Sequence, residues 1–535
     1  MAFRRTSLKA RQRKKQLRKA GKHAAWFGWK SLSLLAGVLI TVPAVILGYA
    51  RTRRQRQWRA IFRTSLGVVF IVVAFSIAFL SSGFGQRTGK ALVQETIFAL
   101  GAELPKDEHG FTNLLLLGVG GGEAHAAKGH KLTDSMMIAS IDSDGRSAVL
   151  LSIPRDFYVE TEYTRGRVNS VIRDESPIFL RELKRQPEHA ARLGELSGQE
   201  RLEYIWMLEA RADARAEENL KKALEKVFEL DIHRTARIDF RGFEKAVDAI
   251  GGIDVVVEQT ISDETYPDFE WGYDPFYLEA GPQHLDGATA LKYARSRHGS
   301  SDFDRARRQQ KVIAAVKEKL TSMQVLTSPG KLRELYGVVQ DNYTSDLSWE
   351  EMITMAELAS KMPRENIITY VLNNNPAAPG GFLVTPDRDL YGGAFVLVPF
   401  LNLTNDKYAQ IRAFLAMIFE HRAITGVDPL QLTILNGTSV GGLAGSLQTA
   451  LERYGWKVGE IDNAEGDEAI TRVRFSDTPR HRKAAELLPR FLPIELEPLP
   501  KPTPMPSTDA EGNAIMITPE PVFEIIIGSD YQQPY

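Results

Sequence analysis

The sequence contains no cysteine. This absence excludes disulfide bonds, thiolate zinc sites, iron–sulfur clusters and a cysteine nucleophile. Acidic residues are missing from one part of the chain, because residues 1–94 contain 19 Lys and Arg but no Asp or Glu. The rest of the 535 residues therefore holds 48 basic and 67 acidic residues, although the formal net charge is zero. A basic N-terminal part ahead of an acidic body is typical of membrane topology signals.

Two apolar runs, 31–50 and 66–84, follow a basic head at residues 1–30. Each is close to the roughly 20 residues that a helix needs to cross a bilayer. The positive-inside rule places the head and the Arg-rich segment 51–63 in the cytoplasm. In one arrangement the first run is re-entrant or interfacial, broken near Pro43, and only the second run spans. In the other arrangement both runs span and the body stays cytoplasmic.

We expect the first arrangement, which makes the protein a cell-membrane protein with an extracytoplasmic body. A nucleic-acid-binding arm is the alternative interpretation of the basic head. Because basic residues flank the apolar runs so closely, we expect the membrane and no nucleic acid as a partner.

The body after a linker at 85–110 alternates apolar strands with amphipathic helices. This alternation predicts an α/β layered domain over 111–325. Residues 176–228 are rich in Glu, Arg, Ala and Leu and predict an inserted helical subdomain. A helical and extended extension follows at 326–428. A small C-terminal α/β domain is expected at 429–530, with a Pro-rich stretch at 493–521. The predicted strands of the first domain include Leu114–Val119, Met136–Ile141 and Ala148–Ile153, and its strongest helices are 286–296 and 303–320.

The segment from Tyr293 to Gln310 predicts an anion-binding site. Arg295 and Arg297 close one helix, and Asp302 can cap the next. Arg305 and Gln309 follow Asp302 at spacings that share one helical face. Helix N-termini bind anions, and Arg binds phosphate oxygens in a bidentate way. The alternative is a solvated, salt-bridged helix face.

Two further segments carry polar residues at strand ends. Arg155 and Asp156 follow an apolar strand, where Arg155 would meet a phosphate and Asp156 would orient it or act as a base. A surface Arg–Asp pair is the alternative. Asp134 precedes another strand, after a Gly-rich loop that bears Glu123 and His125, and is a candidate ligand for Mg²⁺. His125 is equally typical of an ordinary loop histidine.

Seven motifs follow one another in a fixed order between Leu114 and Leu320, and together they resemble the catalytic domain of the LytR-CpsA-Psr family. Residues 431–530 resemble the LytR C-terminal domain that often follows it. The motifs are Leu117-Gly-Val-Gly120, Thr133-Asp-Ser135, Ser152-Ile-Pro-Arg-Asp156, Arg167-Val-Asn169, Gly251-Gly-Ile253, Arg295-Ser-Arg297 and Asp302-Phe-Asp-Arg-Ala-Arg-Arg-Gln309.

The resemblance implies a membrane-anchored phosphotransferase. Such enzymes move a glycopolymer from a polyprenyl-pyrophosphate carrier onto a peptidoglycan acceptor through a phosphodiester bond. The implied fold is an α/β/α sandwich with an apolar tunnel for the lipid. Asp134 would bind Mg²⁺, and Asp156 or Asp302 would act as the catalytic base. The residues implied to hold the pyrophosphate are Arg155, Arg167, Arg295, Arg297, Arg305 and Gln309.

The chain departs from the family pattern at two positions. The first metal-binding Asp of the family falls on Gly120, and the Arg usual before Thr-Asp falls on Leu132. Glu123 or His125 would replace the missing ligand, or the metal would keep an extra water. Three other functions stay open from the sequence: a polyprenyl-pyrophosphate hydrolase, a non-catalytic membrane protein that binds cell-wall polymer, and a cytoplasmic regulator with a DNA-binding head.

Overall fold

The computed structural model describes residues 102–120, 131–267, 272–296, 302–401, 406–503, 505–508, 514–517 and 520–531. The predicted basic head, both apolar runs and most of the linker lie outside these ranges. Glu123, His125 and Arg297 also lie outside them. Within the described ranges, none of the helices combines the length and apolar character needed to span a bilayer.

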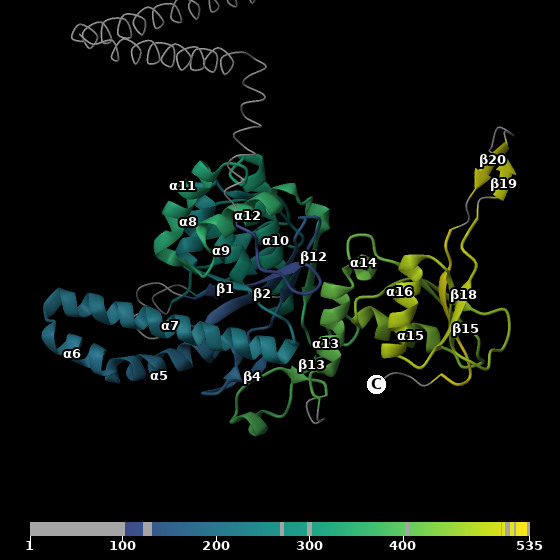
Figure 1. Ribbon diagram of the computed structural model, residues 1–535, viewed down its shortest axis with the longest axis horizontal. Coiled ribbons are helices and arrows are strands. Elements are labelled where there is room, and N and C mark those ends of the chain that lie inside the picture. Colours follow the sequence, from purple (N-terminus) through teal and green to yellow (C-terminus); the bar gives the residue numbers. More distant parts are fainter. Residues whose placement is uncertain are drawn as a thin grey trace, which may run out of the picture. The chain divides into compact units, whose positions relative to one another are not determined.

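A six-stranded mixed sheet forms the centre of the first domain (Figure 1). Its middle strands are continuous apolar runs, as expected for strands buried on both faces. Strand β1 pairs antiparallel with β2, which pairs antiparallel with β3, and β1 pairs parallel with β6. In strand order the sheet is β11 (Tyr343–Ser345), β6 (Arg234–Asp239), β1 (Phe111–Val119), β2 (Thr133–Asp142), β3 (Ala148–Ser152) and β12 (Ile367–Val371).

Helices cover both faces of this sheet, which gives the expected α/β/α layering (Figure 1). Leu115 and Leu117 of β1 belong to one core with apolar residues of the helical insertion. The opposite face lies under a second group of helices, whose side chains form another core with the short strands beside them. This second group consists of α8 (Phe240–Ala249), α9 (Gly287–Arg295), α10 (Asp302–Ser322) and α11 (Pro329–Val339), and α12 (Trp349–Lys361) follows without adding a described residue to that core.

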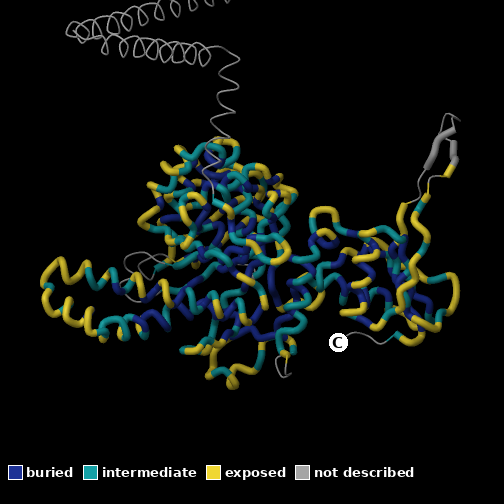
Figure 2. The backbone as a smooth tube through the Cα atoms, viewed as in Figure 1, coloured by how far each residue is buried: buried dark blue, intermediate teal, exposed yellow. Residues whose placement is uncertain are grey.

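Helices occupy the segment of the predicted insertion, beginning at residue 171 instead of 176, ending at residue 228 and interrupted by two breaks. It comprises α5 (Val171–Arg185), α6 (Pro187–Glu195) and α7 (Gly198–Phe228). Pro187 begins α6 because proline fits the first turn of a helix. The end of α7 that packs on the sheet is buried, whereas the region around α6 is largely exposed (Figure 2). The insertion is therefore anchored at one end only.

The sheet takes β11 and β12 from residues 326–428, so part of this predicted extension belongs to the central layer itself. Phe382 and Phe414 also lie in the core of the first domain. Both strands are short, and no periodicity marks them as sheet members. Residues 382–400 of this extension contain the paired strands β13 (Leu383–Val384) and β14 (Val398–Pro399), with a 3-10 turn at Arg388–Tyr391 between them. After it come α13 (Ala409–Leu415) and α14 (Arg422–Thr425), separated by a π-helical turn.

The C-terminal domain is a five-stranded sheet with its own apolar core. It combines strands with helices, as expected of a small α/β domain, and one of its strands, β18, lies inside the Pro-rich stretch. Pro498 is tolerated there because β18 is an edge strand. The elements are β15 (Gln431–Asn436), α15 (Leu443–Arg453), β16 (Lys457–Asn463), β17 (Arg472–Ser476), α16 (Pro479–Leu487), β18 (Glu495–Leu499) and β21 (Phe523–Ile527), with a hairpin of β19 (Met505–Thr508) and β20 (Ala514–Ile517).

Four short strand pairs and hairpins complete the first domain beside the sheet. The hairpin of β4 (Tyr158–Glu160) and β5 (Arg165–Arg167) follows β3 and ends at a predicted site residue. A second hairpin, formed by β8 (Ile261–Asp263) and β9 (Phe276–Leu278), is here called the β8–β9 lobe and includes the described residues between them. It lies in sequence between β7 (Ile253–Val257) and β10 (Gly281–Leu285), which pair with each other.

Candidate active site

A polar cavity of about 540 Å³ lies where the start of β2 meets the ends of β3 and α9. Five residues predicted from the sequence line it, and they come from four separate segments. The structure therefore brings together side chains that are far apart in the chain. The lining residues are Asp134, Ser135, Arg155, Phe240, Asp263, Thr265, Tyr266, Pro267, Arg295, Arg305 and Gln309.

Antiparallel pairing explains why Asp134 and Arg155 meet. Met137 of β2 pairs with Ser152 of β3, so the start of β2 and the end of β3 share one edge of the sheet. Arg155 Nη1 lies 3.4 Å from Asp134 Oδ1. The predicted metal ligand and the predicted phosphate ligand are thus neighbours in this structure.

Asp156 lies buried between two guanidinium groups. Its side chain is only 5% exposed, and its carboxylate oxygens lie 3.4 Å from Arg155 Nε and 3.4 Å from Arg167 Nη1. A carboxylate held by two guanidinium groups fixes their orientation. Of the two roles considered for Asp156, this geometry favours orientation over general base. Arg167 is not among the residues that line the cavity and is connected to it through Asp156.

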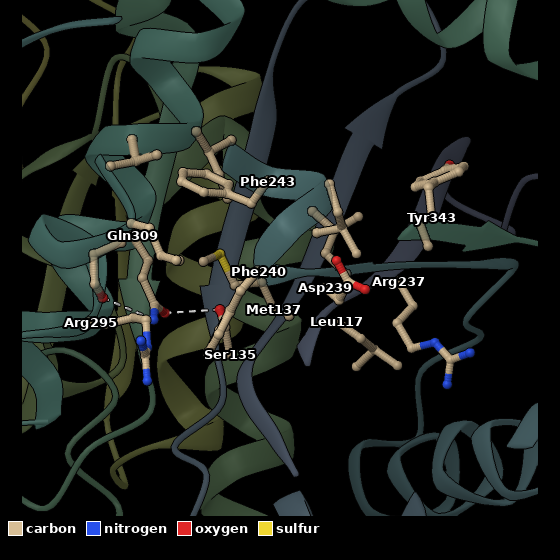
Figure 3. A pocket seen from close by; sticks show the side chains of 18 residues that line it. Leu117, Ser135, Met137, Arg237, Asp239, Phe240, Phe243, Arg295, Gln309 and Tyr343 are labelled. Carbon is tan, nitrogen blue, oxygen red and sulfur yellow. Dashed lines mark hydrogen bonds between the residues drawn. The ribbon is translucent and has the colours of Figure 1, made fainter. Parts of the chain in front are cut away.

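Gln309 joins three elements at the cavity wall. Its Oε1 accepts a hydrogen bond from Ser135 Oγ at 2.9 Å, and its Nε2 donates to the carbonyl oxygen of Ala294 at 3.3 Å (Figure 3). These bonds tie α10 to β2 and to the last turn of α9. Gln309 therefore positions the residues around it, in addition to the phosphate contact that the sequence predicts.

Arg295 is held by aromatic residues. Its Nη1 donates a hydrogen bond to Tyr266 Oη at 2.8 Å. Its guanidinium carbon lies 4.1 Å from the ring centroid of Phe240 and 5.4 Å from that of Tyr266. Within the described part of the chain, no carboxylate lies at ion-pair distance from this side chain. Sequence reasoning missed both aromatic residues, since neither belongs to a polar motif.

The β8–β9 lobe is tied to the last turn of α9 by two more contacts. Asp263, which is 5% exposed, accepts a hydrogen bond from Ser296 Oγ at 2.7 Å. Lys292 Nζ lies 2.5 Å from Asp274 Oδ2. Asp263 is also a cavity-lining carboxylate that the sequence analysis did not identify, because the segment around it shows no recognisable spacing.

Arg308 belongs to the last predicted motif but points elsewhere. Its Nε donates to the carbonyl oxygen of Tyr293 at 3.0 Å, and its Nη2 donates to that of Ser296. Burial lowers the pKa of this guanidinium. Arg308 therefore holds the chain at the end of α9, whereas Arg305, on the same helix and 6% exposed, lines the cavity.

A second, apolar cavity of about 290 Å³ adjoins the polar one, between the sheet and α8, α9 and α10 (Figure 3). It shares Ser135, Phe240, Arg295 and Gln309 with the polar cavity. A charged compartment and an apolar compartment therefore meet at Phe240 and Arg295. Most of the remaining lining is apolar, including Leu116, Leu117, Met137, Ala236, Ile238, Phe243, Leu291, Ala294, Val312 and Ile313.

Asp134 is the described residue that the sequence predicts as a magnesium ligand. A Cβ atom added to Gly120 would lie 3.3 Å from Asp134 Oδ2, so this glycine stands directly beside the carboxylate. The described residues contain no group of three or more His, Asp and Glu suited to a metal ion. Mg²⁺ commonly binds one or two carboxylates together with substrate phosphates and water, a pattern that one protein carboxylate satisfies.

The remaining predicted residues are only partly described. Asp302 is the first residue of α10, one position after the cap that the sequence predicts for it. In the C-terminal domain, the side chain of Asn436 accepts from Thr438 Oγ1 at 2.9 Å and donates to the carbonyl oxygen of Val440 at 3.0 Å. These hydrogen bonds within the loop hold the turn between β15 and α15.

Two relatives of the chain have names that refer to the cell wall or to peptidoglycan. Cell wall biosynthesis protein LcpA of Corynebacterium glutamicum is 27% identical over 408 residues, which cover 72% of this chain and 70% of LcpA. The polyisoprenyl-teichoic acid–peptidoglycan teichoic acid transferase TagU of Oceanobacillus iheyensis is 27% identical over 52% of this chain and 72% of its own length. The crystal structure of Bacillus subtilis TagV covers 59% of this chain and 99% of TagV, with 18% identity and a TM-score of 0.40.

Two family models match the chain in the order that the motifs predict. The model described as LytR cell envelope-related transcriptional attenuator matches residues 430–531. The LytR_cpsA_psr model matches residues 87–382, which is more than half of the chain and includes every residue named in the polar cavity. The chain therefore belongs to the LytR-CpsA-Psr family.

Proposed function

We propose that this protein is a membrane-anchored phosphotransferase that moves a glycopolymer from a polyprenyl-pyrophosphate carrier onto peptidoglycan. The observation that carries the proposal is the junction of the polar and apolar cavities at Phe240 and Arg295. A polyprenyl pyrophosphate combines an apolar chain with adjacent negative charges, and the two cavities match these two parts. The names of the relatives support cell-wall polymer as the transferred group and peptidoglycan as the acceptor.

The cationic side chains of the polar cavity would hold the pyrophosphate while one phosphoryl group is attacked. Arg155, Arg295 and Arg305 all line this cavity. Guanidinium groups fixed in advance stabilise the charge that develops on phosphate oxygens, and this effect supplies most of the rate in phosphoryl transfer. Asp156 contributes by orienting Arg155 and Arg167. Arg297 stays a proposed ligand on the resemblance alone.

The proposed transfer forms one bond to phosphorus and breaks another. A hydroxyl oxygen of the acceptor sugar forms a bond to the phosphorus that carries the glycopolymer. The bond from that phosphorus to the bridging oxygen breaks, and polyprenyl phosphate leaves with the bonding electrons. The glycopolymer keeps one phosphate, which becomes the phosphodiester. The hydroxyl proton passes to a carboxylate, for which we propose Asp302 ahead of the doubly paired Asp156.

Asp134 is the described carboxylate that would hold Mg²⁺ together with phosphate oxygens of the substrate. When bound, the ion would neutralise part of the phosphate charge. We further propose that residues 66–84 span the cell membrane and that the catalytic domain lies outside the cytoplasm. The charge pattern of the sequence supports this topology.

The test uses the full-length chain purified in detergent, a short-chain polyprenyl-pyrophosphate glycan and a peptidoglycan oligomer, with and without Mg²⁺. We expect a phosphodiester-linked conjugate from the unaltered chain and a loss of at least about 100-fold in Arg155→Ala and Arg295→Ala. Arg192→Ala is the matched control, because Arg192 lies on α6 and, among the described residues, pairs only with Glu195, at 3.2 Å. Polyprenyl phosphate without conjugate would indicate a hydrolase instead, and an unchanged donor would indicate a non-catalytic binder.

A further inference from the structure

Arg295 is fixed in place without being neutralised. Its guanidinium lies between the rings of Phe240 and Tyr266, at 4.1 Å and 5.4 Å from their centroids, and donates to Tyr266 Oη at 2.8 Å. Within the described part of the chain, none of its contacts is with a carboxylate. Arg155 in the same cavity differs, because it lies 3.4 Å from Asp134.

We propose that Phe240 and Tyr266 form an aromatic clamp that positions Arg295 for the phosphate groups of the donor. The proposal rests on the proposed function for the nature of that anion. Ring faces attract a cation but carry no net charge. A carboxylate would orient the guanidinium equally well, but it would also cancel the positive charge that a pyrophosphate must meet. The clamp therefore provides orientation without a direct ion pair to the guanidinium.

The two rings contribute in different ways. Phe240 lines both cavities, and its ring edge lies 3.5 Å from the position of a Cβ added to Gly120. Its contact with the guanidinium therefore holds Arg295 at the boundary between the two cavities. Tyr266 adds a hydrogen bond to the guanidinium. Burial raises the pKa of this phenol, so it stays neutral and does not compete with the ligand for the charge of Arg295.

The β8–β9 lobe brings Tyr266 to this position. The bond between Asp263 and Ser296 and the ion pair between Lys292 and Asp274 hold the lobe against the last turn of α9, which ends at Arg295. Tyr266 is only 5% exposed, so its ring is fixed by packing as well as by its hydroxyl. Phe240 and Tyr266 are positioning residues, since they act on the ligand through Arg295.

The experiment measures the affinity of inorganic pyrophosphate for the full-length chain by calorimetry. Tyr266→Phe removes one hydroxyl and keeps the ring, and Phe240→Leu removes a ring face and keeps most of the apolar volume. We expect each variant to raise the Kd about tenfold, the scale of one charged hydrogen bond or one desolvated cation–π contact. Tyr277→Phe in the same lobe, 64% exposed, is the control and should leave the Kd unchanged.

A second measurement separates positioning from general packing. In an Arg295→Ala background, Tyr266→Phe should change the Kd by less than about twofold, because its target is gone. An unchanged Kd in both single variants overturns the clamp. So does a full effect of Tyr266→Phe without Arg295, or an unaltered chain that binds no pyrophosphate. If Phe240→Leu lowers the melting temperature, the Kd measured for Tyr266→Phe alone tests the clamp.

The clamp and the proposed function fail in different ways. If the clamp variants lose pyrophosphate affinity but the unaltered chain forms no conjugate, the clamp stands and the transferase proposal falls. If the unaltered chain forms conjugate and the clamp variants bind and transfer as well as it does, the transferase stands and the clamp falls.

Discussion

Asp156 Oδ1 accepts a hydrogen bond from Arg167 Nη1 at 3.4 Å, and Asp156 Oδ2 lies 3.4 Å from Arg155 Nε. One buried side chain therefore orients two cations from different segments. This relationship predicts that Asp156→Asn lowers the transfer rate about 10- to 100-fold, through both arginines. Asp156→Asn and Arg167→Ala combined should then cost less than the product of the two single effects. Two outcomes would favour Asp156 as the base instead. One is that the effects of the two substitutions multiply. The other is a loss beyond about 1,000-fold in Asp156→Asn with a changed pH profile. The measurement is kcat for the donor across pH.

The position of Gly120 beside Asp134 predicts that a carboxylate placed there raises the affinity for Mg²⁺. Because a Cβ at this position lies 3.3 Å from Asp134 Oδ2, Gly120→Asp would place a second carboxylate beside the first. We expect about tenfold tighter Mg²⁺ binding, measured by calorimetry on the full-length chain. Gly120→Asn is the control of equal size, and an equal change in both variants would contradict a metal role for this corner of the cavity.

The apolar cavity predicts a separation between lipid and phosphate binding. Ala236 lies on its wall, so Ala236→Phe would occupy space meant for the polyprenyl chain. We expect the KM for a polyprenyl-pyrophosphate donor to rise about tenfold, while the Kd of inorganic pyrophosphate stays within about twofold. Val256→Phe on β7 is the control, because Val256 is 63% exposed. A parallel loss of both affinities would show that the two cavities are not independent compartments.

Arg422 predicts a large loss of stability on substitution. This residue is 8% exposed, and its Nη2 donates to Ser140 Oγ at 2.6 Å while its guanidinium lies 3.7 Å from the ring centroid of Phe111. Arg422→Met would leave buried groups of β2 without partners, which costs about 2–4 kcal/mol in the free energy of unfolding. Urea unfolding followed by circular dichroism measures this. Arg388→Met should have little effect, since Arg388 is exposed and its guanidinium carbon lies 5.6 Å from the ring centroid of Phe395.

His421 predicts a loss of stability in acid. Burial, with Lys483 and Arg490 nearby, lowers the pKa of His421 to about 4. Neither ring nitrogen has a hydrogen-bond partner among the described residues. Because the unfolded state then binds the proton more readily, the contribution of His421 is complete above about pH 6.5 and falls as the pH drops towards 4.

The check is the urea midpoint at pH 7 and at pH 5. The drop between these two values should be smaller in His421→Gln than in the unaltered chain. His284→Gln, at a side chain that is 57% exposed, should keep the original pH dependence. An unchanged drop in His421→Gln would refute the assignment.

Periodicity and motif order predicted the strands of the sheet centre, the helical insertion and five of the residues that line the polar cavity. These features leave a local signal, because an apolar run or a helical spacing is visible within about ten residues. Phe240, Tyr266 and Asp263 were missed for the opposite reason. Their role depends on a β8–β9 lobe that folds against α9, and a contact between distant segments has no spacing in the sequence. The same reason explains why β11 and β12 were not assigned to the sheet.

The position of β12 has a consequence for how the chain reaches its fold. Asn366 and Arg146, which hydrogen-bond at this edge of the sheet, are 220 residues apart in the sequence. Strand β3 therefore cannot pair with β12, its outer neighbour, until nearly all of the first domain has been synthesised. Closing so long a loop is slow, and an unpaired hydrophobic strand edge invites association with other chains. Folding of this domain should thus be late, and the outer edge of β3 should stay unpaired until residue 371 is available.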